Sequence, residues 1–474
     1  MELTALSACD ALAVIMRGEV STRELVSASL ARVEAVNTEL NAVVTLAAER
    51  ALTEAETLDA RRARREHIGV LQGLPVVIKD NQRTEGIPTT LGSPLHEHDV
   101  PAADAGIVAR IRAAGGIVIG KTNIPEFSIG ANTVNRLFGA TGNPFAPERT
   151  CGGSSGGSAV AVSAGMVPLA TGSDHGGSLR IPASYCGVVG YRASPGVVPN
   201  EERTTTHTHY SLQGPIARTV SDAALLLSVI AERTGTSRDD PMAFPLDAKK
   251  FRKLDEIDLG TLRVGVSADL GGVLVSEQVR GLFEDRIRRI SALVAGCDPA
   301  PADLIDAPEV DWHLRQDVFV SQYSDRVQDW DDEVNPNVLA TYNSALATPM
   351  ASIARARRRQ IELFRNFAAL FDRFDVVLVP GVSVLPFPWK YANPQEIDGR
   401  PVENYMAWLA LTASLTVVGH PVVALPCGLD YLGTPFGIQV VGPMYGDHRL
   451  LSIANALEQA FASDEVMARP IPEL

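Results

Sequence analysis

The chain has few cysteines, five in 474 residues, and none of them forms a CxxC pair. They are scattered along the sequence and odd in number: Cys9, Cys151, Cys186, Cys297 and Cys427. A disulfide framework needs an even set, and a structural zinc site needs closely spaced thiols. The sequence therefore argues against both, and it fits a reducing, cytoplasmic compartment.

A long apolar run is also missing. The most apolar stretch, residues 159–170, is interrupted by Ser163, Gly165 and Pro168. It falls short of the ~20 residues that span a bilayer. The N-terminal stretch MELTALSACDALAVIMRG has no basic start and carries Asp10 inside its apolar run, so it does not resemble a signal peptide. We expect a soluble protein that does not act at a membrane.

Positive charge is scarce too, because 42 Lys and Arg face 56 Asp and Glu, for a net charge of −14. Such a chain repels the phosphates of nucleic acids and anionic membrane surfaces, which argues against unaided binding to either. Its field better suits a small neutral or cationic substrate. With 46% hydrophobic and 21% charged residues, the composition is that of an ordinary globular protein.

The sequence does contain an alternation of strand-like and helical patterns. Residues 4–65 are expected to be helical, and Ser21 with Glu24 predicts a capping box at the start of one helix. Short apolar runs bounded by glycine or polar residues then predict buried strands, in GLPVVIKD, AGGIVIGKT and MVPLATGSD. Helical patterns such as AGIVARIRAAG lie between them, so we expect an α/β sheet.

The second half continues this alternation. GPIARTVSDAALLLSVIAERTG is predicted as a helix with a proline turn at its start, and DVVLVPGVS, PVVALPCGL and FGIQVVGP as strands. No internal repeat or linker divides the sequence. We predict one large α/β domain over residues 1–474, with a central mixed sheet sandwiched by helices. It comprises a helical N-terminal segment (1–65), a core (66–230) and the rest of the sheet (231–474), with a helical insertion at about 306–375.

Two short motifs match known sites but lack the context that those sites need. Residues 115–122, GGIVIGKT, fit the phosphate-loop pattern, yet the residues between the glycines are strand formers and no helix N-terminus follows. Residues 152–156, GGSSG, fit the nucleophile elbow GxSxG, yet a loop with two prolines precedes them where the elbow needs a strand. We expect neither a nucleotide site nor a lipase-type elbow.

A third pattern is much longer and runs from Thr150 to Ala183, as TCGGSSGGSAVAVSAGMVPLATGSDHGGSLRIPA. This stretch resembles the defining segment of the amidase signature family, which consists of a GGSSGGS loop, a helix, a strand and a GxDxGGSxRxPA turn. The resemblance extends to GLPVVIKD, GKTNIPEF, GPIARTVSD, EIDGRPVENYMAWLALT and PFGIQVVGP. It covers about residues 65–460 and implies the amidase signature fold.

The resemblance implies a Ser–cis-Ser–Lys triad. Ser178 matches the nucleophile, Ser154 the bridging serine and Lys79 the base. The peptide bond between Gly153 and Ser154 is expected to be cis. No metal or organic cofactor is implied, because the lysine and the serines supply every proton transfer.

The chemistry of these residues agrees with those roles. A serine hydroxyl is a weak nucleophile until a base removes its proton. Lys79 ends the apolar run LPVVI, so burial is expected to lower the pKa of its ammonium, as a lysine base requires. Ser154 is expected to pass the proton from Ser178 to Lys79 and to return one to the leaving nitrogen, since amide hydrolysis depends on that second transfer.

Neighbouring residues receive supporting roles. Backbone N–H groups of four residues are expected to face the oxyanion: His175, Gly176, Gly177 and Ser178. Four other residues are expected to hold the loop: Asp174, Arg180, Ser155 and Ser158. Asp174 and Arg180 are expected to pair with each other, or with Ser158 and the backbone. These residues are therefore expected to act on the geometry of the turn.

The substrate pocket is less fully specified. By its place in PEFSIG, Ser128 is expected to line the acyl pocket together with Phe127 and Ile129. His175 departs from the family pattern, in which threonine or a small or β-branched residue is more common. Its ring is expected in or near the pocket, with its role left open. Asp174, His175 and Ser178 are not expected to form a triad, although they lie close together in the sequence.

Three functions remain under consideration. The first is a stand-alone hydrolase of amides, anilides or hydrazides that acts on a small molecule. The second is the glutaminase subunit of a tRNA-dependent amidotransferase, and the third a catalytically inactive scaffold. The C-terminal motifs and the acidic charge favour the first, and the intact triad argues against the third. Relatives are often homodimers, which nothing in the sequence tests.

Overall fold

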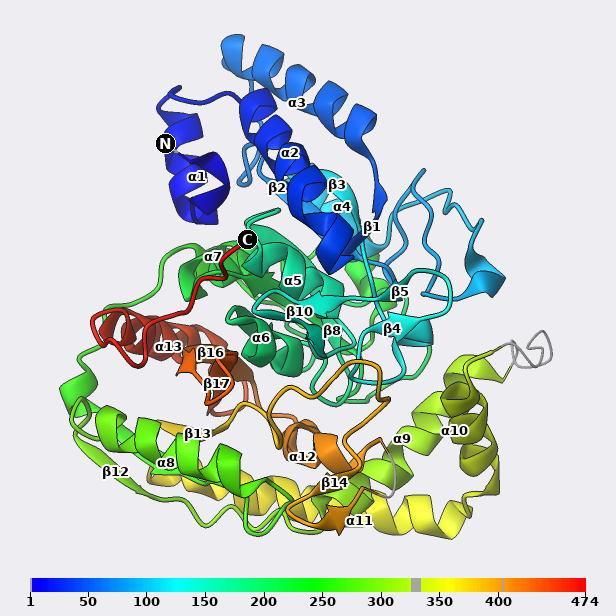
Figure 1. Cartoon of the computed structure of the whole chain (residues 1–474), viewed down its shortest axis with the longest axis vertical. Helices are drawn as coiled ribbons and strands as arrows, with labels where there is room; N and C mark the ends of the chain where they lie inside the picture. Colours follow the sequence, from blue (N-terminus) through cyan, green and yellow to red (C-terminus); the bar gives the residue numbers. More distant parts are fainter. Residues whose placement is uncertain (1, 325–333, 403–404) are drawn as a thin grey trace.

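A mixed β-sheet runs through the middle of the computed structural model, which describes residues 2–324, 334–402 and 405–474 (Figure 1). Eleven strands of the described residues form it, in the order β1 (Val43–Leu46), β3 (Ile117–Thr122), β2 (Pro75–Lys79), β8 (Leu169–Asp174), β10 (Leu212–Ala217), β9 (Val189–Arg192), β16 (Val422–Leu429), β17 (Pro435–Val441), β13 (Val376–Pro380), β11 (Arg263–Val266) and β12 (Gly296–Pro299). Short two-stranded sheets lie outside it, including β6 (Gly142–Asn143) with β7 (Ala146–Thr150). The predicted central mixed sheet is confirmed.

Helices cover both faces of this sheet, as predicted. They are α1 (Ala8–Met16), α2 (Thr22–Leu40), α3 (Ala48–Ala63), α4 (Gly106–Ala113), α5 (Gly156–Ser163), α6 (Arg180–Cys186), α7 (Val220–Ile230), α8 (Glu277–Ile290), α9 (Ala307–Tyr323), α10 (Pro336–Ala347), α11 (Met350–Ala368), α12 (Ala410–Val418) and α13 (Asp447–Phe461). None of the described helices is long and apolar enough to cross a membrane. The capping box of Ser21 and Glu24 at the start of α2 is confirmed.

The alternation of side chains along β2 shows how the sheet separates two apolar cores. Val76 and Ile78 pack in the core that includes α4, α7 and α13, whereas Val77 packs in the core that includes α2, α3 and α5. Successive side chains of a strand point to opposite faces, so a strand buried on both faces is apolar at every position. This explains the continuous apolar run before Lys79, and it places Lys79 on the α5 face.

Three strands lie where the sequence analysis expected another structure, and β9 and β12 were not predicted at all. β1 lies inside the segment that was predicted to be helical, and it pairs antiparallel with β3 at the sheet edge. β10 takes the place of the predicted proline turn before α7, pairing along its whole length with β8. β7 precedes the GGSSG loop, although it pairs with β6 outside the central sheet. Each of the three strands is short. β1 and β10 are stabilised by pairing with strands that are distant in the sequence, and the prolines around β7 obscure its strand pattern.

In the region predicted at about 306–375 to be a helical insertion, the described residues form α9, α10 and α11, and residues 325–333 lie outside the described residues. These three helices form a lobe at one end of the molecule, away from α1 and α3 (Figure 1). The predicted strands at GLPVVIKD, AGGIVIGKT and MVPLATGSD are present as β2, β3 and β8. β2 runs parallel to β8, so both strands present their carboxyl ends at one edge of the sheet.

Gly157 tests how closely α5 must approach the sheet. A Cβ atom at this position would lie 2.5 Å from the Asn123 backbone nitrogen and 2.6 Å from the Ala42 carbonyl oxygen. We expect Gly157→Ala to lower the free energy of unfolding by ~1–3 kcal/mol, the usual cost of overpacking. Gly235→Ala is the matched control, because no atom lies within 4 Å of the corresponding Cβ position. Denaturant unfolding measures both, and an unchanged stability in Gly157→Ala contradicts the packing argument.

Candidate active site

Lys79 is a fully buried lysine at the carboxyl end of β2. Its Nζ donates to Ser154 Oγ at 2.8 Å and to Ser173 Oγ at 2.9 Å. Burial lowers the pKa of its ammonium to about 7, although the negative charge of Asp174 acts in the opposite direction. A lysine with this pKa is partly neutral at pH 7 and has a lone pair that can accept a proton.

Ser154 lies in the loop between β7 and α5, and the peptide bond from Gly153 to Ser154 is cis, as expected. Its neighbour Ser155 joins this loop to the adjacent turn. The Ser155 N–H donates to the Ser178 carbonyl oxygen at 3.3 Å, and its hydroxyl donates to the Ser173 carbonyl oxygen at 3.2 Å. Ser155 therefore holds the two serine-bearing segments side by side.

Ser178 lies in the turn between β8, which ends at Asp174, and α6, which begins at Arg180. It is half-buried, and it lines the same cavity of about 220 Å³ as Ser154 and Ser173. The structure thus brings the three expected triad residues to one place: Ser154 and Ser178 line one cavity, and Lys79 contacts Ser154 directly. We refer to this space as the active-site cavity.

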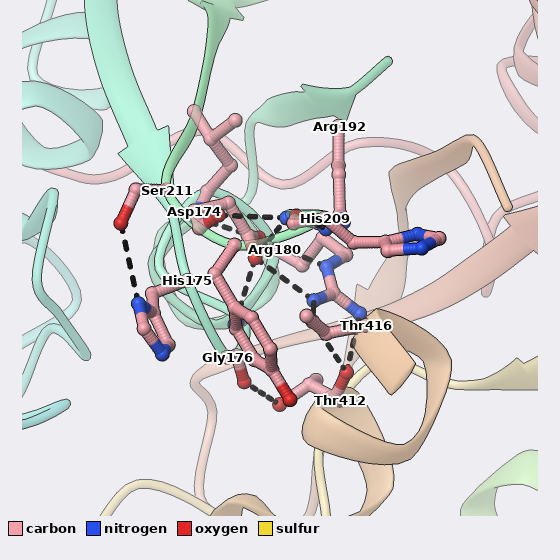
Figure 2. Close-up of polar contacts among 12 residues, drawn as sticks. Asp174, His175, Gly176, Arg180, Arg192, His209, Ser211, Thr412 and Thr416 are labelled. Atoms are coloured by element: carbon pink, nitrogen blue, oxygen red, sulfur yellow. Dashed lines mark hydrogen bonds and ion pairs between the residues drawn. The ribbon is translucent and has the colours of Figure 1, made fainter. Parts of the chain in front are cut away.

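The Asp174 side chain stabilises the turn that carries Ser178. Its carboxylate accepts hydrogen bonds from the Gly177 and Leu179 backbone N–H groups and from the Arg180 and Arg192 guanidiniums, all at 2.9–3.2 Å. Figure 2 shows Asp174 beside both guanidiniums, with dashed lines marking the contacts. Burial alone would raise the pKa of Asp174, but the two guanidiniums outweigh it and hold that pKa well below its usual range. The expected Asp174–Arg180 pair is present.

Arg180 extends the same network to the C-terminal part of the chain. Its Nη1 donates to the Thr412 carbonyl oxygen and to Gln439 Oε1, and its Nη2 donates to Thr416 Oγ1, each at 2.9 Å. The Thr412 hydroxyl in turn donates to the Gly176 carbonyl oxygen at 2.6 Å, as Figure 2 shows. Helix α12 is thereby attached to the turn that carries Ser178.

The expected set of oxyanion donors needs one correction. The Gly177 N–H donates to Asp174 Oδ1 at 2.9 Å, so it is committed to the turn. Gly177 has a φ of 130°, and a Cβ there would lie 2.3 Å from Thr412 Oγ1. Glycine is therefore required at this position for close approach and backbone conformation. The N–H groups of His175, Gly176 and Ser178 remain the candidate oxyanion donors.

The His175 ring lies in the wall of the active-site cavity. It packs against Tyr210, with ring centroids 4.4 Å apart, and its Nδ1 lies 3.2 Å from Ser211 Oγ. Burial first, and then the charges of Arg315 and Arg192, hold the pKa of His175 well below its usual value. The ring is therefore neutral at pH 7. Figure 2 shows it turned away from the Asp174 carboxylate, which excludes a triad within GSDHGGSLR.

Ser128 also lines the cavity, with Phe127 and Ile129 on either side of it. Its Oγ is buried and has no hydrogen-bond partner among the described residues, so it can bond to a bound molecule. Ser158 differs from its expected place beside Asp174 and Arg180. Its hydroxyl donates to the Thr171 carbonyl oxygen at 2.8 Å and lies 2.7 Å from Thr122 Oγ1, so it fixes α5 to the sheet.

Sequence reasoning missed Ser173, Arg192 and Arg315. Ser173 lies inside the quoted motif, but its proximity to Lys79 follows from the parallel pairing of β2 and β8. Arg192 ends β9 and Arg315 lies on α9, and no local pattern marks either residue. Among the described residues, no cluster of histidine, cysteine and carboxylate side chains is arranged to hold a metal ion.

Comparison with known proteins gives matches over nearly the whole chain. The family model described as Amidase matches residues 24–451. A glutamyl-tRNA(Gln) amidotransferase subunit of Thermosynechococcus vestitus is 33% identical over 470 residues, which cover 94% of this chain and 96% of that protein.

Two solved structures allow a comparison of folds. A bacterial aryl acylamidase of the amidase signature family superposes with a TM-score of 0.88, at 25% identity and 96% coverage of both chains. The corresponding glutamyl-tRNA(Gln) amidotransferase subunit of Thermotoga maritima superposes with a TM-score of 0.73, at 26% identity, covering 100% of this chain and 98% of that one.

Ser173→Ala tests the second hydrogen bond of Lys79. Removing this acceptor destabilises the ammonium in a buried site, so the pKa of Lys79 falls and the acidic limb of activity moves to lower pH. We also expect the maximal rate to fall by about tenfold, the usual effect of losing one hydrogen bond to a charged group. The measurement is the rate at which a fluorophosphonate labels Ser178 as a function of pH. Ser173→Thr keeps the hydroxyl and should restore the profile; an unshifted Ser173→Ala profile contradicts the assignment.

Proposed function

The chain belongs to the amidase signature family, and from this premise we propose that it hydrolyses carboxylic amides and related acyl C–N bonds, including those of anilides and hydrazides. The observation that carries the proposal is the 2.8 Å hydrogen bond between Lys79 and Ser154 beside the cavity that Ser178 lines. This arrangement provides a base, a relay and a nucleophile without any cofactor.

The reaction proceeds through an acyl-enzyme on Ser178. Neutral Lys79 accepts a proton from Ser154 while Ser154 accepts one from Ser178, whose oxygen attacks the amide carbon. Backbone N–H groups of His175, Gly176 and Ser178 stabilise the negative charge on the carbonyl oxygen. The relay then runs in reverse and protonates the leaving nitrogen. Water repeats the sequence to release the acid.

We infer that the chain acts without a partner subunit. Its fold superposes better on the aryl acylamidase, with a TM-score of 0.88, than on the Thermotoga maritima amidotransferase subunit, with 0.73. Glutamine also carries an α-ammonium that a buried site must neutralise. Among the described residues that line the cavity, Glu202 is the one carboxylate, and Arg83 already pairs with it at the surface.

The alternative is the glutaminase subunit of a tRNA-dependent amidotransferase. It is favoured by the 33% identity to the Thermosynechococcus vestitus amidotransferase subunit over 94% of this chain. Such a protein would release ammonia from glutamine for use by its partners. The two candidate functions use the same triad. They differ only in the substrate and in whether activity depends on other chains.

A panel assay with the purified chain distinguishes them. We expect turnover of at least one amide, anilide or hydrazide by the chain alone, and its loss in Ser178→Ala. Glutamine hydrolysis that appears on addition of amidotransferase partner subunits would establish the alternative. A chain whose Ser178 is not labelled by a fluorophosphonate and which hydrolyses nothing in the panel would be an inactive scaffold.

Lys79→Ala tests the base and its pH dependence. Because neutral lysine is the active form and its pKa is about 7, amide hydrolysis should rise as the pH increases through about 7 and then level off. We expect Lys79→Ala to lose this limb and to slow amide hydrolysis by ~10²–10⁴-fold. Hydrolysis of 4-nitrophenyl acetate should fall less, since its leaving group needs no proton. Equal losses for the two substrates would overturn the role of Lys79.

A further inference from the structure

One face of α9 forms part of the wall of the active-site cavity. Four of its residues line that space: Arg315, Val318, Phe319 and Gln322. Residues at spacings of three, four and seven share one face of a helix, so α9 presents a continuous strip to the bound substrate. Arg315 is the charged member of this strip, and it is 8% exposed.

Arg315 is held in place by two of its three nitrogens. Nε pairs with Asp311 of the preceding turn at 3.3 Å, and Nη1 donates to Tyr405 Oη at 2.9 Å and to Met406 Sδ. The third nitrogen, Nη2, lies 3.5 Å from the position that a Cβ on Gly176 would occupy. The guanidinium thus presents one edge to the turn that carries Ser178.

The other charged residues that line the cavity have their partners elsewhere. Glu202 pairs with Arg83, and Arg203 pairs with Asp240 at 3.0 Å. Among the described lining residues, Arg315 is the cation placed beside the nucleophile turn. Its Nη2 faces the Gly176 turn from the cavity wall, where it can donate a hydrogen bond to a bound group.

His175 supplies a second donor on the same wall. Its Nε2 is buried and has no hydrogen-bond partner among the described residues. When Nδ1 accepts from the Ser211 hydroxyl, 3.2 Å away, Nε2 carries the proton and can donate. His175 and Arg315 both line the active-site cavity, and they are close enough for the charge of Arg315 to lower the pKa of His175.

We propose that Arg315 and His175 form a subsite for a carboxylate of the substrate, so that the preferred substrates are amides with a carboxylate a few bonds from the scissile carbonyl. This proposal rests on the proposed amide hydrolysis. Guanidinium–carboxylate hydrogen bonds are charge-assisted and strong, and Arg315 itself is largely shielded from water. The neutral imidazole of His175 would donate a second, directional hydrogen bond to the same carboxylate without adding a second full charge.

The negative charge of the chain does not oppose this subsite. The net charge of −14 disfavours the approach of anions from a distance, but that field is screened over about 8–10 Å at physiological salt. Inside the cavity the nearest charge decides binding. A buried cation beside the nucleophile therefore selects an anionic substrate on an acidic protein, in contrast to the preference that composition alone predicts.

The test compares matched substrates that differ in one carboxylate. Succinamate against butyramide places the carboxylate on the acyl side, and N-acetyl-β-alanine against N-propylacetamide places it on the amine side. We expect kcat/KM to favour the carboxylate member of one pair by about tenfold or more, the strength of a hydrogen bond to a charged group. Arg315→Gln should remove this preference, and His175→Thr should reduce it.

Arg203→Gln is the matched control, because it removes another cavity arginine and should keep the preference. Three results would overturn the proposal. The first is that the unchanged chain shows no preference in either pair of substrates, and the second is that the preference survives in Arg315→Gln. The third is that Arg315→Gln lowers kcat equally for both members of a pair. The last result would assign Arg315 to the oxyanion. Turnover of 4-nitrophenyl acetate in each variant reports the triad separately, so its absence from the unchanged chain would count against the proposed function instead.

Discussion

The active site depends on the buried carboxylate of Asp174. It accepts hydrogen bonds from the turn that carries Ser178 and from the guanidiniums of Arg180 and Arg192. Arg180 in turn contacts α12, and Arg192 ends β9, so one side chain connects the nucleophile with distant parts of the sheet. A buried carboxylate is stable only when it is paired and fully hydrogen-bonded. Every group that satisfies it is thereby fixed in position.

The positions of the strands along the chain could be predicted from the sequence only in part. Apolar runs such as the one before Lys79 mark strands that are buried on both faces, and the structure has these strands where they were expected. β1 and β10 were missed because four to six residues with proline or little alternation carry a weak local signal. Their pairing with β3 and β8 supplies the stabilisation, and such long-range pairing leaves no trace in local periodicity.

The sequence predicted those residues of the candidate site that lie in contiguous sequence motifs. Lys79 and Ser154 were identified and are in contact, whereas the donor role expected of Gly177 was wrong because Asp174 uses its N–H. Arg315 could not be found, since it comes from a helix that only the folded chain brings to the cavity. Residues that perform the chemistry lie in local sequence patterns, while residues that surround the substrate come from separate elements.

A comparison of two buried lysines shows how the structure separates a base from a structural cation. Lys79 and Lys121 lie at the ends of neighbouring parallel strands, and both are fully buried. Lys121 lies 3.4 Å from the carboxylate of Asp80, and burial lowers its pKa only to about 8. Lys79 meets hydroxyl groups in place of a carboxylate, and its pKa falls to about 7. A carboxylate at hydrogen-bond distance would favour the ammonium and remove the lone pair, so burial without such a partner is what allows Lys79 to act as a base.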